Sequence, residues 1–166
     1  MLNLIESFSK IVLPISVAHA HCDIPCCIYD PGDAIQAAQT VVRMTELIEE
    51  IDFSGGPSKE LGNSLMRYVS AKEDHATKAK EDILIIWTDY FKPEHLEKYP
   101  DLHDLFWQAM KNASKTRQQV SLDAAEELLE SVRKIAEIFW ATKGSETKRQ
   151  AFPSPAGGEI VYPVSN

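Results

Sequence analysis

Apolar residues recur at intervals of three and four along four stretches of this chain, and this spacing limits the possible folds more than any other feature. Such spacing places the apolar side chains on one face of an α-helix. The four predicted helices run from residue 31 to about 51, from 58 to about 90, from 101 to before 121, and from 121 to about 144. No segment shows the period of two that is typical of a strand. The sequence therefore predicts an all-α fold, an antiparallel four-helix bundle with short connections.

Residues at the ends of these stretches support the predicted boundaries. Asp30 followed by Pro31 is typical of a helix start, Ser121 predicts another N-cap, and Gly144 predicts a C-terminal stop. The charged side chains of the fourth helix are interpreted as its solvated face; they are Glu126, Glu127, Glu130, Arg133 and Lys134. Three prolines and a Gly-Gly pair predict a flexible tail over residues 145–166.

The charge and hydropathy of the chain exclude two classes of partner. The formal net charge is −8, and the basic residues form no cluster. We therefore expect no binding of a nucleic-acid backbone. No apolar run approaches the roughly 18 residues that span a bilayer, so we expect no membrane partner.

All three cysteines lie in the stretch AHAHCDIPCCIYDP, residues 18–31. Disulfide frameworks spread their cysteines along a chain to close loops, and no cysteine follows Cys27. The cluster therefore indicates metal ligands or redox thiols. A Cys-x-x-x-Cys pair near a terminus also fits a thiol-redox protein or an incidental zinc site.

Residues 1–20 have features of a leader. An apolar stretch precedes Ala18-His19-Ala20, which suits cleavage after Ala20 by a processing protease. The charged residues before the apolar stretch, Glu6 and Lys10, are atypical of secretion, and an N-terminal helix that is never removed is the alternative. The predicted organisation is a cleaved leader over 1–20, a metal-binding hook plus helical bundle over 21–144, and the tail.

Cleavage after Ala20 would create a metal site. The new α-amine of His21, the amide nitrogen and thiolate of Cys22, and the thiolate of Cys26 can lie in one plane around a metal ion, with the His21 imidazole in an axial position. A planar set of two nitrogens and two sulfurs suits Ni(II) or Cu(II), whereas zinc prefers a tetrahedron. Loading displaces protons from the amine and thiols, so metal affinity should rise with pH.

Three segments resemble the nickel-containing superoxide dismutases. HCDIPCCIYDP at residues 21–31 closely resembles the nickel hook of that family. WTDYFKP and the residues after it, 87–103, and IFWATK, 138–143, match in the same order. The resemblance implies a homohexamer of four-helix bundles with one nickel ion per subunit, cycling between Ni(II) and Ni(III). It also implies an oxidoreductase that converts superoxide to dioxygen and hydrogen peroxide, after a protease has removed the leader.

The resemblance also implies the site residues. The metal ligands are His21, Cys22 and Cys26, and the catalytic residues are Tyr29, Asp23, Tyr90 and Lys92. Tyr29 would lie over the open face of the metal, and Asp23 would hold the hook. Tyr90 and Lys92 would line the approach, where a local positive charge can steer an anion towards an acidic protein.

The chain departs from the family pattern at three places. Cys27 occupies a position that is usually glycine. Many members orient the axial imidazole with a glutamate and an arginine, and Ala37 and His75 occupy those places here. The third departure is the segment after Lys143.

Two other functions compete with the enzyme. One is a non-catalytic nickel or copper binding protein on the same bundle, and the other is a thiol-redox helical protein. Tyr29 and Lys92 favour catalysis, because metal storage needs neither residue. Thiolate ligands are easier to load in a reducing compartment, so we expect a cytoplasmic location; secretion or a periplasmic location is the alternative.

Overall fold

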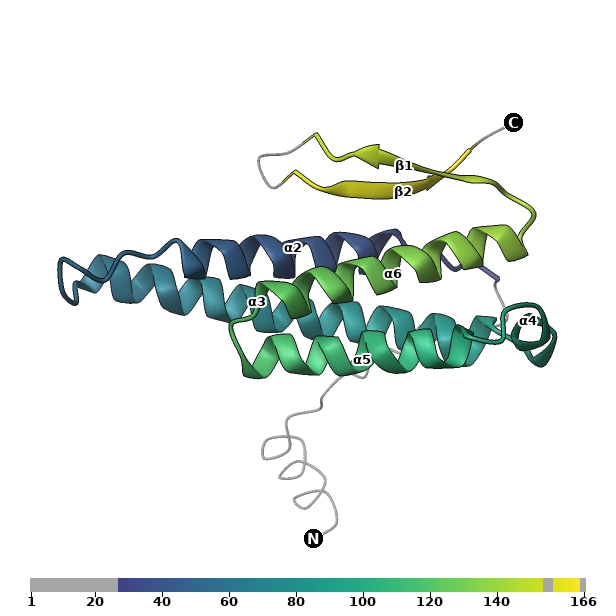
Figure 1. Ribbon diagram of the computed structural model, residues 1–166, viewed down its shortest axis with the longest axis horizontal. Helices are drawn as coiled ribbons and strands as arrows, with labels where there is room; N and C mark the ends of the chain where they lie inside the picture. The colour runs from purple at the N-terminus through teal and green to yellow at the C-terminus, as the bar shows by residue number, and fades with distance from the viewer. Residues whose placement is uncertain (1–26, 154–156, 165–166) are drawn as a thin grey trace, which may run out of the picture.

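The structure, a computed structural model, describes residues 27–153 and 157–164. The elements are α2 (Gly32–Glu49), α3 (Lys59–Ile85), the π-helix η1 (Ile86–Tyr90), α4 (Pro93–Lys98), α5 (Leu102–Gln118), α6 (Leu122–Thr142), β1 (Thr147–Ala151) and β2 (Glu159–Pro163). Helices α2, α3, α5 and α6 form the bundle, which confirms the predicted fold class (Figure 1). Within the described residues no helix is long and apolar enough to cross a membrane.

The bundle core combines many alanines with a few large side chains. Helix α2 packs against α3 and α6, and α5 packs against α3 and α6. The alanines of the core are Ala34, Ala37, Ala38, Ala76, Ala79, Ala109, Ala113, Ala125 and Ala136. Small side chains let the helix backbones approach closely, and Phe139, Ile35 and Leu128 fill the remaining space. Beyond this core, the joined ends of α2 and α3 extend past α5 and α6 (Figure 1).

The predicted helix boundaries hold within two residues at most ends. The Ser121 hydroxyl accepts a hydrogen bond from the Ala124 amide at 3.3 Å and caps α6, as predicted. Gly144 follows α6 with a φ of +76°, a conformation that glycine adopts without strain. Helix α2 begins at Gly32, one residue later than expected, and the Asp30 carboxylate accepts from the Gly32 amide at 2.7 Å.

The second predicted helix changes its geometry before it ends. Helix α3 gives way to η1 at Ile86, and the Phe91 amide donates to the Ile86 carbonyl at 3.2 Å. This i→i+5 bond is the mark of a π-helix, which is frequent at functional sites. The short helix α4, which the sequence analysis did not predict, follows directly.

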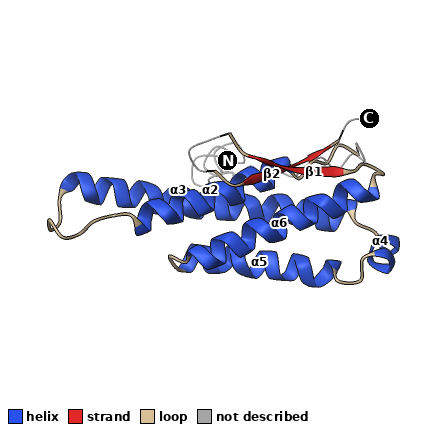
Figure 2. Cartoon of the chain, turned by 45° about the horizontal axis from the view of Figure 1, so that its top comes forward, coloured by secondary structure: helices blue, strands red, loops and turns tan. Residues whose placement is uncertain are grey.

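Two segments of the predicted flexible tail, Thr147–Ala151 and Glu159–Pro163, form strands instead. Strands β1 and β2 pair antiparallel, with Arg149 opposite Val161, and the hairpin lies over α2 and α6 (Figures 1 and 2). Val161 is buried against the bundle. The prolines and glycines that suggested a tail lie mostly between the two strands, where turn residues belong.

Charged side chains of α6 hold the hairpin. The Arg149 guanidinium donates two bonds to Glu130, at 2.8 and 2.9 Å, and two to Glu137, at 2.6 and 3.3 Å. Arg133 donates from Nε to the Glu159 carbonyl at 2.9 Å. The interpretation of Glu130 and Arg133 as a solvated face was therefore wrong, because their partners come from residues after the bundle.

Arg149→Gln should flatten the acid dependence of stability. Hydrogen bonds from Arg149 hold the pKa of the Glu130 carboxyl below its usual range. A carboxyl whose pKa is lower in the folded than in the unfolded state stabilises the fold at pH values above its unfolded-state pKa. This stabilisation is lost as the pH falls through the folded-state pKa. We expect the variant to lose about 1 kcal/mol or less of unfolding free energy at pH 7. That difference should shrink below about pH 4. Urea denaturation at several pH values measures it.

Lys148→Gln is the matched control for this change. Lys148 is the exposed neighbour of Arg149 on β1, and successive strand residues point to opposite faces. Its replacement removes one positive charge without touching Glu130. Equal acid profiles for the two variants would contradict the role of the Arg149 pairs.

Candidate metal centre

Two of the predicted site residues meet at one end of the bundle. Tyr29 lies just before α2, and Tyr90 is the last residue of η1. Their ring centroids are 5.7 Å apart with an interplanar angle of 57°, and both side chains are half-buried. The fold therefore places Tyr90 beside a residue of the predicted hook segment, Tyr29.

Tyr90 lies against a cluster of rings. Its centroid is 4.6 Å from that of Phe139, 5.3 Å from that of Phe91, and 5.7 Å from that of His95, which is nearly parallel to it. Phe139 belongs to α6, His95 to α4, and Phe91 follows the end of η1. Contacts on several sides fix the Tyr90 ring by packing.

The end of α6 brings two further side chains to Tyr90. The hydroxyls of Tyr90 and Thr142 are 2.7 Å apart. The Lys143 ammonium lies 5.3 Å from the Tyr90 ring centroid and 4.9 Å from that of Phe139, within the range of a cation–π contact. The sequence analysis quoted both residues in the segment 138–143 but gave them no role, because their partners become visible only in the fold.

Lys92 lies two residues after Tyr90, at the start of α4, with its side chain exposed. Its backbone amide donates to Nδ1 of His95 at 3.1 Å, which fixes the His95 ring beside Tyr90. Lys92 and Lys143 therefore add two positive charges at this end of an acidic chain. Such a local field can attract a small anion in spite of the net charge.

Cys27, the first described residue, has a φ of +58° and an exposed side chain. Glycine adopts this left-handed conformation far more readily than other residues. The backbone thus turns directly after Cys26. His21, Cys22, Asp23 and Cys26 lie outside the described residues.

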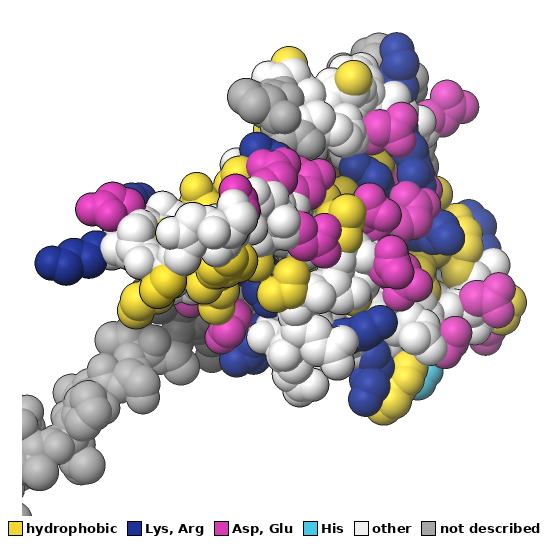
Figure 3. All heavy atoms as spheres, turned by 60° about the vertical axis from the view of Figure 1, so that its left-hand side comes forward, with side chains coloured by type: hydrophobic (Ala, Val, Ile, Leu, Met, Phe, Trp, Pro, Cys, Tyr) yellow, Lys and Arg dark blue, Asp and Glu magenta, His cyan; other side chains and the backbone are white. Residues whose placement is uncertain are grey.

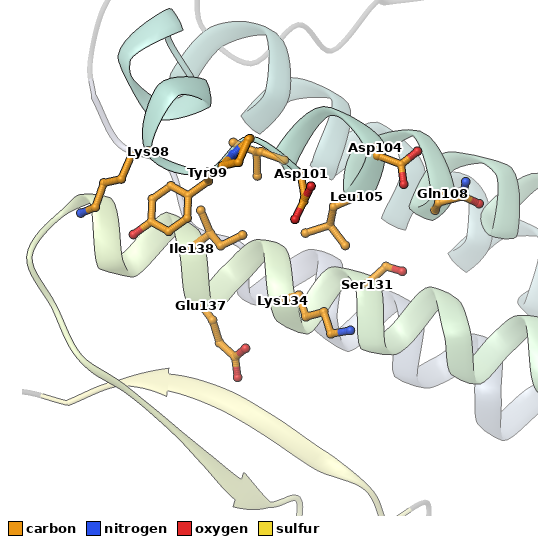
Figure 4. A pocket seen from close by; sticks show the side chains of 12 residues that line it. Lys98, Tyr99, Asp101, Asp104, Leu105, Gln108, Ser131, Lys134, Glu137 and Ile138 are labelled. Carbon is orange, nitrogen blue, oxygen red and sulfur yellow. The ribbon is translucent and has the colours of Figure 1, made fainter.

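A pocket of about 590 Å³ lies elsewhere, between α5 and α6. Figure 4 shows Asp101 and Asp104 on one side of it and both Lys134 and Glu137 on the other. Neither tyrosine of the pair and neither lysine beside it lines this pocket. Its mixed charges give it no preference for an anion, so the tyrosine pair remains the candidate site.

Comparison with known proteins decides the family. The family model described as nickel-containing superoxide dismutase matches residues 16–143. The chain belongs to this family. The superoxide dismutase [Ni] of Streptomyces coelicolor is 34% identical over 139 residues, which cover 81% of this chain and 97% of the relative. The enzyme of Streptomyces seoulensis is 33% identical over 138 residues, with the same coverage.

Solved nickel superoxide dismutase structures share the fold. The native structure at 1.30 Å has a TM-score of 0.62 at 34% identity and covers 74% of this chain and 99% of its own. An apo structure has a TM-score of 0.60 at 31% identity and covers 71% of this chain and 99% of its own. The predicted family, oxidoreductase activity and nickel cofactor are confirmed, and superoxide is the substrate. The hairpin lies beyond the residues that the family model matches.

The donor set of this nickel superoxide dismutase fits nickel. Residues 21–26 offer imidazole and thiolate donors within six positions, and thiolate and imidazole donors suit this metal. Cys27, directly after these residues, has a left-handed backbone conformation. Within residues 27–153 and 157–164, no group of three or more His, Cys, Asp or Glu side chains could hold a metal ion.

Two family positions that orient the axial imidazole differ here. Ala37 is buried in the core and has no polar side-chain atom. The His75 ring lies 2.8 Å from the Ala71 carbonyl of its own helix, at Nδ1. Neither residue provides the carboxylate or guanidinium that the family resemblance implies at these positions.

Proposed function

We propose that superoxide disproportionation in this chain takes place at the N-terminal hook, with His21, Cys22 and Cys26 as nickel ligands. The observation that carries the assignment is the contact between the rings of Tyr29 and Tyr90. Tyr29 lies three residues after Cys26 in the sequence. Bound nickel supplies one-electron redox chemistry. The overall reaction converts two superoxide ions and two protons to dioxygen and hydrogen peroxide.

The described residues shape how substrate arrives. Lys92 and Lys143 attract the anion, since both ammonium groups lie at the end of the bundle that holds the tyrosine pair. The Tyr29 ring narrows the approach. The rings of Phe139, Phe91 and His95 pack against the Tyr90 ring and hold it in place. Asp23 would hold the hook in position, as the family resemblance implies.

The direct test uses a processed chain that starts at His21. Nickel content by mass spectrometry and superoxide decay by pulse radiolysis are measured on the same sample. We expect about one nickel ion per chain and decay well above that of free nickel. Nickel binding without enhanced decay would contradict the enzyme and leave a metal-binding protein.

A single extra residue at the N-terminus should weaken nickel binding. In a chain that starts at Ala20, the His21 nitrogen is an amide and the α-amine is displaced by one residue. We expect at least about tenfold lower affinity, comparable to the loss of a group that orients a ligand. Competition with a chelator measures it, and the chain that starts at His21 is the control. Equal affinities would show that cleavage after Ala20 does not create the site.

A homohexamer and a cytoplasmic location complete the proposal. Large apolar side chains are exposed on the described surface, among them Met66 and Phe53. Figure 3 views the molecule from the side on which the joined ends of α2 and α3 extend, and it shows hydrophobic side chains between charged ones there. Such surfaces suit subunit contacts. Light scattering of the processed protein should give six times the chain mass, and cell fractionation tests the location.

A further inference from the structure

The hydrogen bonds at Tyr90 have a fixed direction. The Thr142 hydroxyl donates to the Phe139 carbonyl at 2.6 Å, and a carbonyl oxygen can only accept. A threonine hydroxyl carries one proton, so Thr142 has none left for Tyr90. The bond of 2.7 Å between the two hydroxyls must therefore be donated by Tyr90. The result is a one-way chain from Tyr90 to Thr142 to Phe139.

The end of α6 explains why Thr142 uses its proton in this way. The Lys143 amide, the usual α-helical partner of the Phe139 carbonyl, bonds to the Trp140 carbonyl at 3.0 Å. The last carbonyls of a helix need other donors. Phe139 is fully buried, which raises the cost of leaving its carbonyl without one. The threonine hydroxyl meets this need.

We propose that Thr142 is a positioning residue that makes Tyr90 a hydrogen-bond acceptor towards the approach. With its only proton donated to Thr142, the Tyr90 oxygen offers lone pairs alone. It can then hold a molecule that carries protons, such as water or the product hydrogen peroxide. The Tyr90 hydroxyl cannot donate a hydrogen bond to superoxide, which as an anion binds to hydrogen-bond donors. This inference rests on the proposed function, since it assigns a task to a residue of that site.

The inference divides the work between the residues of the site. Attraction of the anion falls to Lys92 and Lys143, whose ammonium groups are donors only. Tyr90 places a proton-bearing molecule beside that path. Disproportionation consumes two protons for each peroxide formed, so a water held at this point lies where protons are needed.

Thr142→Val is the decisive variant. Valine keeps the branched shape of threonine and removes the hydroxyl, whereas Thr142→Ser keeps the hydroxyl. Exchange of the Tyr90 hydroxyl proton with solvent is followed by NMR on the processed protein, which starts at His21 and carries ¹³Cζ-labelled tyrosine. Comparison with the Tyr90→Phe variant assigns the Tyr90 signal. We expect the Tyr90 hydroxyl proton to exchange about fivefold faster in the valine variant, because one hydrogen bond is lost. The serine variant should match the wild type.

Inhibition of the nickel-loaded enzyme by azide gives the second readout. Azide is an anion that only accepts hydrogen bonds. In the valine variant Tyr90 can donate to it, so we expect an inhibition constant about fivefold lower. In a Tyr90→Phe background the valine change should have no effect. An unchanged exchange rate, an unchanged inhibition constant, or a serine variant that behaves like the valine variant would overturn the proposal.

The two readouts separate this inference from the proposed function. Proton exchange at Tyr90 does not depend on dismutation. If the Thr142 variants change the exchange rate as expected but the nickel-loaded protein does not dismutate superoxide, the proposed function is overturned and the hydrogen-bond chain stands. Full dismutation with unchanged exchange in the valine variant would overturn the role of Thr142 alone.

Discussion

Replacement of Cys22 or Cys26 by serine is expected to leave the processed chain without bound nickel. A thiolate is a strong, soft donor, and a neutral serine hydroxyl does not replace it on this metal. Removal of groups that only orient a ligand already costs about 10–100-fold, so loss of a ligand should lower dismutation at least about a hundredfold. Metal analysis and superoxide decay on the same preparation measure both effects.

Cys27→Ser is the matched control, because it makes the same chemical change one residue after Cys26. Cys27 occupies a position that is usually glycine in the family and is not among the proposed ligands. We expect this variant to keep its nickel and most of its activity. Full nickel content in a Cys22→Ser or Cys26→Ser chain would refute the proposed ligand set. Loss of nickel in the Cys27→Ser chain would add Cys27 to it.

Phe139→Ala should cause the largest loss of stability among changes near the site. Phe139 is fully buried, and its ring packs against those of Tyr90 and Trp140. Truncation removes apolar contacts and leaves a cavity, so we expect the unfolding free energy to fall by about 3–5 kcal/mol. Denaturation with urea measures this loss. Because the Tyr90 ring loses its support, dismutation at low temperature should fall as well.

Trp107→Ala serves as the comparison for this change. Trp107 is also a large aromatic residue of the bundle, but its side chain is 55% exposed. We expect a change of about 0.5 kcal/mol, as is usual for surface positions. A loss below about 1 kcal/mol for Phe139→Ala would mean that the core collapses around the cavity.

The helices of the bundle were predictable because their signal is local. Apolar spacing and capping residues such as Ser121 lie within the segment that they define. The hairpin carries a weaker signal, since its strands have only five residues each, and β1 is polar apart from Ala151. Arg149 and Glu130 are held together by the fold and lie 19 residues apart in sequence. A pairing of this kind cannot be read from either segment alone.

The site was predictable only in part, for a similar reason. Tyr29, Tyr90 and Lys92 came from short segments that resemble one family. The bond between Tyr90 and Thr142 joins residues 52 positions apart, and helix packing alone brings them together. The π-helix also escaped detection, because one turn of different winding leaves the spacing of apolar residues nearly unchanged.

The hairpin has a consequence for how subunits can assemble. It lies over the outer side of α2 and α6, and Val161 is buried beneath it. A second subunit that approached from that side would meet β1 and β2 before it met either helix. In the proposed homohexamer, subunit contacts are therefore left to the remaining surfaces, such as the extended α2–α3 end. In that assembly, the residues after the family match would determine which sides of the bundle are open to a neighbouring subunit.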